Sequence, residues 1–565
     1  MLDSSFADLK ISAGSKSSFT ATAKALGGAD KATLKVITSW NESGAEKSFT
    51  QEIELPVRAA WPVVTVGGSG TFTPGKTQLD IPLDDFTGKI SGALTLADTP
   101  AVNVTQAVNF LNSYPYGCLE QTISGAWPFI ILPDAIHELD PEIVNDAQTR
   151  EKADNAITRI QSMQLYDGSF AMWPGQNQTY SWGSVYAAHF LLTARNAGIN
   201  FPEEMLTGAL NWLREYLASM PEYSYPGQER DDMTVKAYAV YVLALNGERP
   251  LGWIEYLREN ESSLLPSGHI YLAGAQSIID GKADALRGLN AGRASGWSGM
   301  TLESDARNTA LLLTMWLDVE PQSPEATELA QKLTGIRWFS TQDNAAALVA
   351  LARYNVESAG AKSDITAHVN TETSDKPIIA FKSGEGASGM KIDGLPKGAN
   401  ILIEAEGSGQ GCYSWSITGT PKSQPKPERR NVNIECLYYD EAGNAIDLSQ
   451  PVEHGKIIQV VLGVKPSMTV NNLALSYLLP AGFELENPRL DDGMNDEGNN
   501  AGVVNDIRDD RLVLFFGRLS GERSYGFKMR AVTRGTFKVP QVSASGMYDA
   551  SIRFTGSFQP DVTIR

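Results

Sequence analysis

The chain has few of the residues that form disulfide frameworks or metal centres. Of its 565 residues only three are cysteines, Cys118, Cys412 and Cys436, and its five histidines are scattered. Three cysteines do not make a disulfide framework, and no Cys/His spacing matches a zinc site. Cys412 and Cys436 could pair in an oxidising compartment, but their spacing does not fix the geometry of a disulfide, so we expect two buried free thiols. We expect no metal and no other cofactor.

Positive charge and long apolar runs are also scarce. The 47 Lys and Arg residues are outnumbered by 66 Asp and Glu residues, which gives a net charge of −19. This acidity argues against nucleic-acid binding and against a basic membrane-docking face. No transmembrane stretch and no signal peptide are visible. Because Met1-Leu2-Asp3 leads straight into strand-like sequence, we expect a fragment without its natural N-terminus, and the missing signal then says nothing about export.

Strand-like sequence occupies both ends of the chain, and the length predicts about three to five domains. Apolar and polar residues alternate on both sides of a central block, which is typical of strands. Between the strands we predict a glycine-rich turn after Val66, a linker at Thr420–Arg430 and a solvated acidic loop at Leu490–Arg511. The predicted strands are Ser17–Ala25, Ala32–Thr38, Phe49–Val57, Val63–Val66, Thr77–Ile81, Lys89–Leu96, Thr366–Asn370, Ile378–Phe381, Asn400–Ala405, Gly411–Gly419, Asn431–Tyr439, Lys456–Val464, Leu473–Leu479, Leu512–Leu519, Ser524–Val532 and Thr536–Ala544.

The central block, residues 101–357, is rich in alanine, leucine and tryptophan. Four of its segments repeat small residues and leucines at helical spacing, which predicts stacked helical hairpins in an α/α toroid. These segments are Ser184–Ala197, Thr234–Asn246, Asp305–Leu317 and Asp343–Tyr354. Gln164–Phe170 and Trp338–Asp343 resemble loops that open helices in such toroids. We interpret them as helix caps, and therefore as evidence of fold and not of a site.

One stretch carries reactive chemistry, Tyr114-Pro115-Tyr116-Gly117-Cys118-Leu119-Glu120-Gln121. A tight turn would bring the Cys118 sulfur against the Gln121 carbonyl three residues away. Attack by the thiolate, with loss of ammonia, would then form an internal thioester. An exposed thioester hydrolyses, and Tyr114 and Tyr116 are well placed to shield it. Spacing alone does not decide, since such a cysteine can equally be a small buried hydrophobe.

The residues Tyr116-Gly117-Cys118-Leu119-Glu120-Gln121-Thr122 closely resemble the thioester signature of the alpha-2-macroglobulin and complement family. Leu119 stands where the vertebrate pattern usually has glycine, which resembles the bacterial branch. The resemblance covers the whole chain, although only this region is specific. It implies a multidomain α and β protein, with an α/α-toroid thioester domain inserted in a CUB-like β-domain and flanked by macroglobulin-like β-sandwiches.

The implied domains follow the change from strands to helices and back. They are a partial macroglobulin-like sandwich at 1–60, the first CUB-like half at 61–100, the toroid at 101–357, the second CUB-like half at 358–424 and a C-terminal macroglobulin-like sandwich at 425–565.

The resemblance implies a broad-spectrum protease inhibitor and not an enzyme. In the family a protease cuts an upstream bait segment and the protein collapses around it. A lysine of the protease then attacks the Gln121 acyl carbon while Cys118 leaves as a thiolate, which a helix starting near Gln121 should favour. By resemblance we expect a bacterial periplasmic protein, anchored at the inner membrane by a lipid on the missing N-terminus, with a penicillin-binding peptidoglycan synthase as a further partner.

Three more residues enter the predicted site. Glu120 could be a local base, but we favour the simpler role of a first-turn carboxylate that complements the helix dipole. Gly546-Met547-Tyr548-Asp549 resembles a Met-Tyr-Asp element near the C-terminus of bacterial relatives. Met547 and Tyr548 would therefore complete the shield opposite Tyr114, with ordinary core packing as the alternative for Met547.

Two other classes stay open. One is an α/α-toroid enzyme of the terpene cyclase or prenyltransferase type, although residues 101–357 contain no Asp-Asp-x-x-Asp cluster and no Asp/Cys/His zinc set. The other is a structural β-array module with an inactive Cys-Leu-Glu-Gln motif.

The distribution of histidines predicts what the thioester attacks. Some complement components carry a histidine downstream of the thioester glutamine that redirects the acyl group to hydroxyls. The corresponding stretch here, Ser219–Pro226, has none, and His189 lies too early and His269 too late. We predict amide formation with amines and slow reaction with glycerol, as measured by mass spectrometry. Rapid ester formation with glycerol, weakened by replacing His189 or His269, would contradict this.

Overall fold

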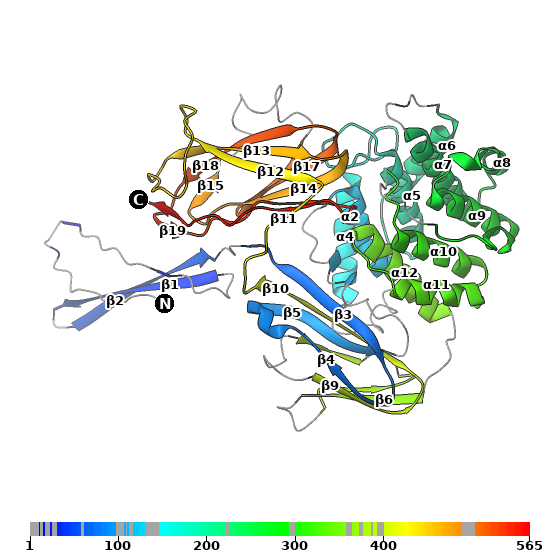
Figure 1. Cartoon of the computed structure of the whole chain (residues 1–565), viewed down its shortest axis with the longest axis horizontal. Helices are drawn as coiled ribbons and strands as arrows, with labels where there is room; N and C mark the ends of the chain where they lie inside the picture. Colours follow the sequence, from blue (N-terminus) through cyan, green and yellow to red (C-terminus); the bar gives the residue numbers. More distant parts are fainter. Residues whose placement is uncertain are drawn as a thin grey trace.

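A computed structural model gives the arrangement of the chain as three bodies and one projecting hairpin (Figure 1). The residues that it describes are 11, 15–16, 23–24, 31–43, 45–57, 61–97, 107–108, 110–111, 117–131, 146–220, 223, 227–292, 300–357, 364–371, 377–385, 388–392, 401–486 and 503–565. The helices gather at one side, and helices α2 and α4 face the C-terminal strands (Figure 1).

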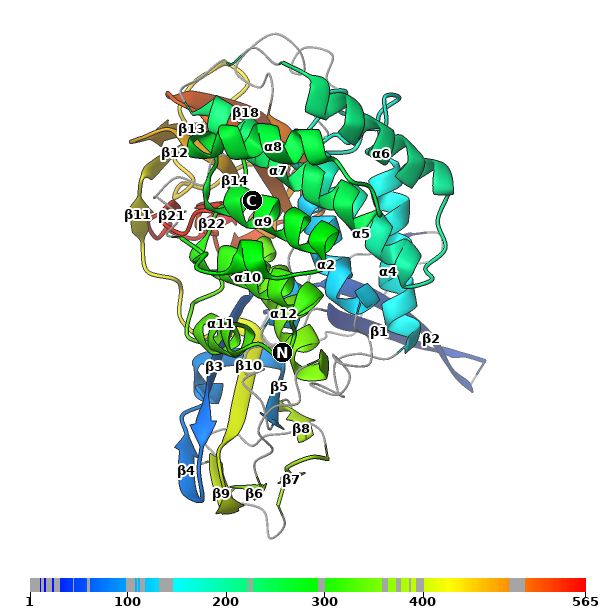
Figure 2. The ribbon, with the colours of Figure 1, turned by 90° about the vertical axis from the view of Figure 1, so that its right-hand side faces the viewer.

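The helices close into a ring, which confirms the predicted α/α toroid. Around the inside α2 packs on α5, followed by α7, α9, α10 and α12, and α12 returns to α2 (Figure 2). Helices α4, α6, α8 and α11 pack outside this ring. The bounds are α2 Leu119–Ile131, α4 Asp146–Gln161, α5 Ser181–Asn196, α6 Glu203–Ala218, α7 Gln228–Leu245, α8 Leu251–Glu259, α9 Pro266–Asp280, α10 Asp305–Val319, α11 Pro324–Thr334 and α12 Thr341–Glu357. Inner helices are buried nearly all round because both faces are covered, as α7 is over Asp231–Ala244.

A two-sheet β-unit is assembled from strands on both sides of the toroid. Its strands are β3 Val64–Phe72, β4 Gly75–Leu79, β5 Phe86–Ala97, β6 Asp364–Thr371, β7 Ile379–Lys382, β8 Ser388–Lys391, β9 Ile401–Ser408 and β10 Gly411–Pro421. The two sheets have the orders β3-β10-β5-β8 and β4-β9-β6-β7. Each sheet therefore mixes strands from before and after the helices, which confirms that the toroid is inserted in one β-unit.

The glycine-rich turn predicted after Val66 is shorter than expected, because its first glycines belong to β3 and only Thr73 and Pro74 separate β3 from β4. Within β3, Gly68 pairs with Trp415 and Gly70 with Tyr413 of β10. A β-carbon on Gly68 would lie 2.8 Å from the Trp415 ring, and one on Gly70 would lie 2.5 Å from the Tyr413 hydroxyl. These glycines leave room for two aromatic rings that lie across the strand, so their absent side chains serve packing and not chain reversal.

The C-terminal body is a β-sandwich. A six-stranded sheet, β11-β21-β20-β14-β17-β16, faces a four-stranded sheet, β12-β13-β18-β15, and β19 pairs with β22. The strands are β11 Glu428–Arg430, β12 Val432–Tyr439, β13 Ile457–Pro466, β14 Val470–Leu478, β15 Phe483–Leu485, β16 Val504–Arg508, β17 Arg511–Leu519, β18 Arg523–Ala531, β19 Gly535–Phe537, β20 Ser543–Gly546, β21 Arg553–Thr555 and β22 Val562–Ile564.

Three local predictions in this body were wrong. The strand predicted at Thr536–Ala544 is split into β19 and β20; Pro540 lies between them and cannot donate to a ladder. Part of the predicted acidic loop Leu490–Arg511 forms β16, and Arg511 begins β17. The predicted linker Thr420–Arg430 is shorter, because its ends belong to β10 and β11.

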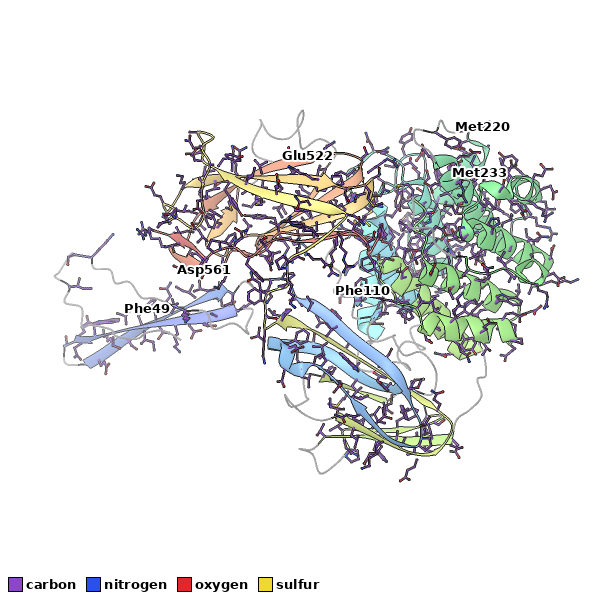
Figure 3. The ribbon with its side chains drawn as sticks, in the orientation of Figure 1. Phe49, Phe110, Met220, Met233, Glu522 and Asp561 are labelled. Atoms are coloured by element: carbon purple, nitrogen blue, oxygen red, sulfur yellow. The ribbon has the colours of Figure 1, made fainter. Side chains whose placement is uncertain are left out.

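In the described part of residues 1–60, the regular structure is one hairpin, β1 Lys31–Glu42 paired with β2 Ala45–Pro56. Phe49 lies on this hairpin, away from the helices (Figure 3). Cys412 in β10 and Cys436 in β12 are both free thiols; Cys412 is buried, whereas Cys436, also expected to be buried, is only partly so. None of the helices in the described ranges is long and apolar enough to cross a membrane.

The packing of β3 on β10 gives a prediction. We expect Gly68→Ala to lower the free energy of unfolding by about 1–3 kcal/mol, because the rigid Trp415 ring must move. Gly463→Ala in β13 is the matched control, since its nearest neighbour would be Glu435 at 3.8 Å. Urea unfolding measures both, and equal stabilities of the two variants would contradict this account.

Candidate functional site

Cys118 occupies the position just before helix α2 and caps it. The Thr122 N–H donates to the Cys118 carbonyl at 2.9 Å, the first bond of the helix. The Gln121 N–H lies 3.5 Å from Cys118 Sγ, and the Cys118 N–H donates to Gln121 Oε1 at 3.2 Å. This reciprocal pair is the pattern of a capping box, with cysteine in the place of serine or threonine. The helix begins at Leu119, two residues earlier than predicted.

The capping box explains the spacing of the predicted pair. A capping box requires its two side chains at N-cap and N3, which are three residues apart. Ordinary helix-start geometry therefore holds the Cys118 sulfur and the Gln121 carboxamide together without any distant contact.

The turn before α2 is held from both sides. The Gly117 carbonyl accepts a hydrogen bond from Arg159 Nε at 2.8 Å, and a β-carbon on Gly117 would lie 2.9 Å from the same guanidinium. The Leu119 N–H donates to the Met172 carbonyl at 2.9 Å, and the Leu119 side chain is buried in the toroid core. The motif neighbours Gly117 and Leu119 thus fix the backbone on which Cys118 stands.

The Cys118 sulfur is enclosed where the toroid meets the C-terminal sandwich. Its side chain is 0% exposed and packs in one apolar cluster with Trp173, Ala474, Val513, Phe515 and Met547. Trp173 comes from the loop before α5, and its ring lies 4.3 Å from that of Phe515 in β17. Met547 follows β20, so the structure brings it to the predicted pair. Tyr114 and Tyr116 lie outside the described residues.

Tyr548 connects the sandwich to both sides of the motif. Its hydroxyl donates to Glu120 Oε2 at 2.7 Å and lies 3.7 Å from Cys118 Sγ. Tyr548 and Glu120 are 428 residues apart in the sequence, so this hydrogen bond connects two distant parts of the chain.

Glu120 lies in the first turn of α2, as expected, but its carboxylate does not face solvent there. Its side chain is 0% exposed. Besides Tyr548 it accepts hydrogen bonds from Ser124 Oγ, from Thr341 Oγ1 at 2.8 and 2.9 Å, and from Gln342 Nε2 at 3.0 Å. Four neutral donors from three parts of the chain replace the water that such a carboxylate normally binds.

Thr341 and Gln342 were missed as site residues. They belong to the loop Trp338–Asp343, which was interpreted as a plain helix cap. The cap does exist, because Asp343 accepts from the Phe339 and Ser340 N–H groups. The available signal was the run of four polar residues, Thr341 to Asn344, directly before the apolar run Ala345–Ala352.

The electrostatics favour the neutral thiol. Burial, followed by the charge of Glu120, raises the pKa of the Cys118 thiol to about 12, and the N–H groups of Gln121 and Glu120 offset only part of this. Burial likewise raises the pKa of Glu120, while its four hydrogen bonds lower it. The expected help of the helix end for a thiolate is therefore outweighed while the site is closed.

Gln121 is placed for acyl chemistry. Its side chain is buried, its Oε1 accepts from the Cys118 N–H, and its Nε2 has no hydrogen-bond partner among the described residues. A backbone N–H on the carbonyl oxygen polarises the amide carbon, and the nitrogen becomes able to accept a proton once attack has formed a tetrahedral intermediate. The arrangement can support transfer of the acyl group from nitrogen to the adjacent sulfur.

The two histidines considered for transfer to hydroxyls belong to the toroid. His189 in α5 is bonded to the Tyr238 hydroxyl at 2.9 Å and packs edge-on to Trp127 at 4.7 Å. Burial lowers the pKa of His189 to about 3, so its ring is neutral. His269 lies in α9. Within the described ranges no group of three His, Cys, Asp or Glu side chains could hold a metal ion.

Comparisons with known proteins find similarity to alpha-2-macroglobulins, above all bacterial ones. Residues 93–223 match the model of the A-macroglobulin TED domain, and residues 432–550 match that of the bacterial alpha-2-macroglobulin MG10 domain. The chain is 28% identical to the alpha-2-macroglobulin of Xylella fastidiosa strain Temecula1, over 95% of this chain and 34% of that protein. It is 28% identical to that of Escherichia coli K12, over 91% of this chain and 32% of that protein.

Solved structures give the same fold. Native alpha-2-macroglobulin of E. coli from domain MG7 to the C-terminus superposes with a TM-score of 0.78 at 24% identity, over 95% of this chain and 94% of that one. A structure of E. coli alpha-2-macroglobulin in its native conformation gives a TM-score of 0.78 at 25% identity, over 95% of this chain and 35% of that one. The chain thus spans about a third of the length of the curated relatives it matches.

The capping box gives a stability prediction. Cys118→Ser should be more stable than Cys118→Ala by about 1 kcal/mol, because serine restores the acceptor for the Gln121 N–H. Urea unfolding followed by helical circular dichroism measures the difference. Ser323→Ala, which removes the side-chain cap of α11, gives the ordinary cost for comparison. A serine variant no more stable than the alanine variant would contradict the capping role.

Proposed function

We propose that this chain, which belongs to the bacterial alpha-2-macroglobulin family, is the part of a protease inhibitor that carries a thioester formed between Cys118 and Gln121. The family comprises protease inhibitors and not catalytic enzymes. The observation that carries the proposal is the pair of reciprocal hydrogen bonds between Cys118 and Gln121, enclosed beneath Met547 and Tyr548.

The closed site would preserve the thioester in two ways. The apolar cluster of Trp173, Phe515 and Met547 excludes water and amines from the acyl carbon. The same surroundings also make the thiolate a poor leaving group, because burial raises the pKa of the Cys118 thiol to about 12. An amine that reached the carbonyl would then have to expel an ion that nothing solvates.

Activation would consist of moving the sandwich away from α2. The family's upstream bait cleavage is the proposed trigger. Loss of the wall formed by Phe515, Met547 and Tyr548 admits water, which solvates the departing Cys118 thiolate and lets the N–H groups at the start of α2 stabilise it. A lysine amine of the captured protease attacks the Gln121 acyl carbon, an amide forms and the carbon–sulfur bond breaks.

The structure around His189 supports direct attack by amines. Its ring nitrogen is hydrogen-bonded to Tyr238, and its ring packs nearly perpendicular to the rings of Trp127 and Tyr241. Neither Cys118 nor Gln121 is among these contacts. We therefore infer that lysines are the partners and that hydroxyls react slowly.

The alternative of a toroid enzyme is supported by no observation. The inner face of the ring is filled by side chains, as where the rings of Tyr238 and Tyr271 stack at 4.0 Å.

We also propose, from the family resemblance alone, a periplasmic location with an N-terminal lipid anchor at the inner membrane, and a peptidoglycan synthase as a neighbour.

The proposed function predicts the mass of the folded chain. It should be lighter than its sequence by one ammonia, and Cys118 should resist thiol reagents until methylamine is added. Methylamine should then add once, at Gln121, and release one thiol. Cys118→Ala should show neither the mass loss nor the addition. A folded parent with its full mass and an unmodified amide at Gln121 would refute the proposal.

A further inference from the structure

We infer that Tyr548 is a catalytic residue in the formation of the thioester and that Glu120 is the positioning residue behind it, which accepts the proton of the Cys118 thiol through the Tyr548 hydroxyl. This inference rests on the proposed function and deepens it, because it states how the thioester arises and which domain must be present.

The path for the proton is continuous. The Tyr548 hydroxyl lies 3.7 Å from Cys118 Sγ and donates to Glu120 Oε2 at 2.7 Å. One hydroxyl can therefore take a proton from the sulfur while it passes its own to the carboxylate. The sulfur is 0% exposed, so water cannot perform this step in the closed site.

Glu120, at the end of this path, is well suited to accept the proton. Glu120 is buried and all the hydrogen bonds it accepts come from neutral groups. Burial raises the pKa of this carboxyl above its ordinary value, which makes it a better proton acceptor than an exposed glutamate. The thiol needs such an acceptor, because its own pKa is raised to about 12.

The other half of the reaction is prepared at Gln121. Its carbonyl oxygen accepts the Cys118 N–H at 3.2 Å, so the negative charge of a tetrahedral intermediate would develop at an existing donor. Its Nε2 has no hydrogen-bond partner among the described residues and can take up a proton as it leaves.

The step balances without any other reactant. The thiol proton passes to the Tyr548 oxygen as the Tyr548 proton moves to Glu120, and the sulfur attacks Cδ of Gln121. The proton on Glu120 then returns through Tyr548 to the amide nitrogen. The carbon–nitrogen bond breaks, ammonia leaves and the carbon–sulfur bond remains.

This mechanism couples formation of the thioester to domain docking. Cys118, Glu120 and Gln121 begin α2, whereas Tyr548 belongs to the C-terminal sandwich. The thioester would form only once the sandwich is docked. It would therefore appear only where it is already protected from water.

Tyr548→Phe tests the inference, since it keeps the ring and removes the hydroxyl. The fraction of chains with a thioester should fall at least about tenfold, in line with the usual contribution of acid–base catalysis, and Gln121 should keep its amide. Intact mass and peptide mapping give both results. Tyr525→Phe makes the same change at a buried position of the same sandwich and should leave the thioester fraction unchanged.

Two further variants separate formation from protection. Met547→Ala opens the apolar wall, so the thioester should form and then hydrolyse, which converts the Gln121 amide to a carboxylic acid. Glu120→Gln should instead leave the Gln121 amide, as Tyr548→Phe does. A merely structural role of Glu120 would expose a thioester already formed and give the acid.

The outcomes are distinguishable from a failure of the proposed function. A parent chain lighter by one ammonia, with Tyr548→Phe and Glu120→Gln retaining the Gln121 amide, supports the inference. If either variant is as light as the parent, or carries the carboxylic acid, the relay is overturned and the thioester stands. A parent of full mass overturns both proposals.

Discussion

The buried carboxylate of Glu120 is the point on which the closed arrangement depends. It accepts hydrogen bonds from α2 itself, from the start of α12 and from the C-terminal sandwich. A buried carboxylate is costly unless hydrogen bonds replace its water, and leaving one donor out costs about 1–3 kcal/mol or more. Tyr548 supplies one of these bonds, so separating the sandwich from the toroid removes one hydrogen bond from the Glu120 carboxylate. Domain docking and the state of the motif are thereby linked through one side chain.

The same contact has consequences for reactivity. The site is dry because Trp173 of the toroid and Phe515 of the sandwich close over Cys118 together, and neither domain alone forms that cluster. Dryness protects an acyl group and also suppresses the thiolate that would have to leave. Movement of the sandwich away from α2 would admit water and amines and would also stabilise the departing thiolate. The acyl group is therefore inert when covered and reactive when exposed.

Local patterns predicted most of the architecture. The α/α toroid, its insertion in a β-unit and the strand-rich ends follow from helical and alternating periodicity, and the Cys118–Gln121 pair follows from a capping pattern that needs only neighbouring residues. Two features were missed because each depends on a partner distant in sequence. Gly68 looked like a turn residue because nothing nearby indicated the Trp415 ring. The burial of Glu120 was missed because its donors Thr341 and Tyr548 lie 221 and 428 residues away.

The measurement that tests the central claim most directly is a high-resolution crystal structure of this chain. The account predicts continuous electron density between Cys118 Sγ and the side-chain carbonyl carbon of Gln121, with Met547 and Tyr548 covering the bond. A separate thiol and carboxamide at these positions, or a sandwich that leaves Cys118 open to solvent, would contradict it.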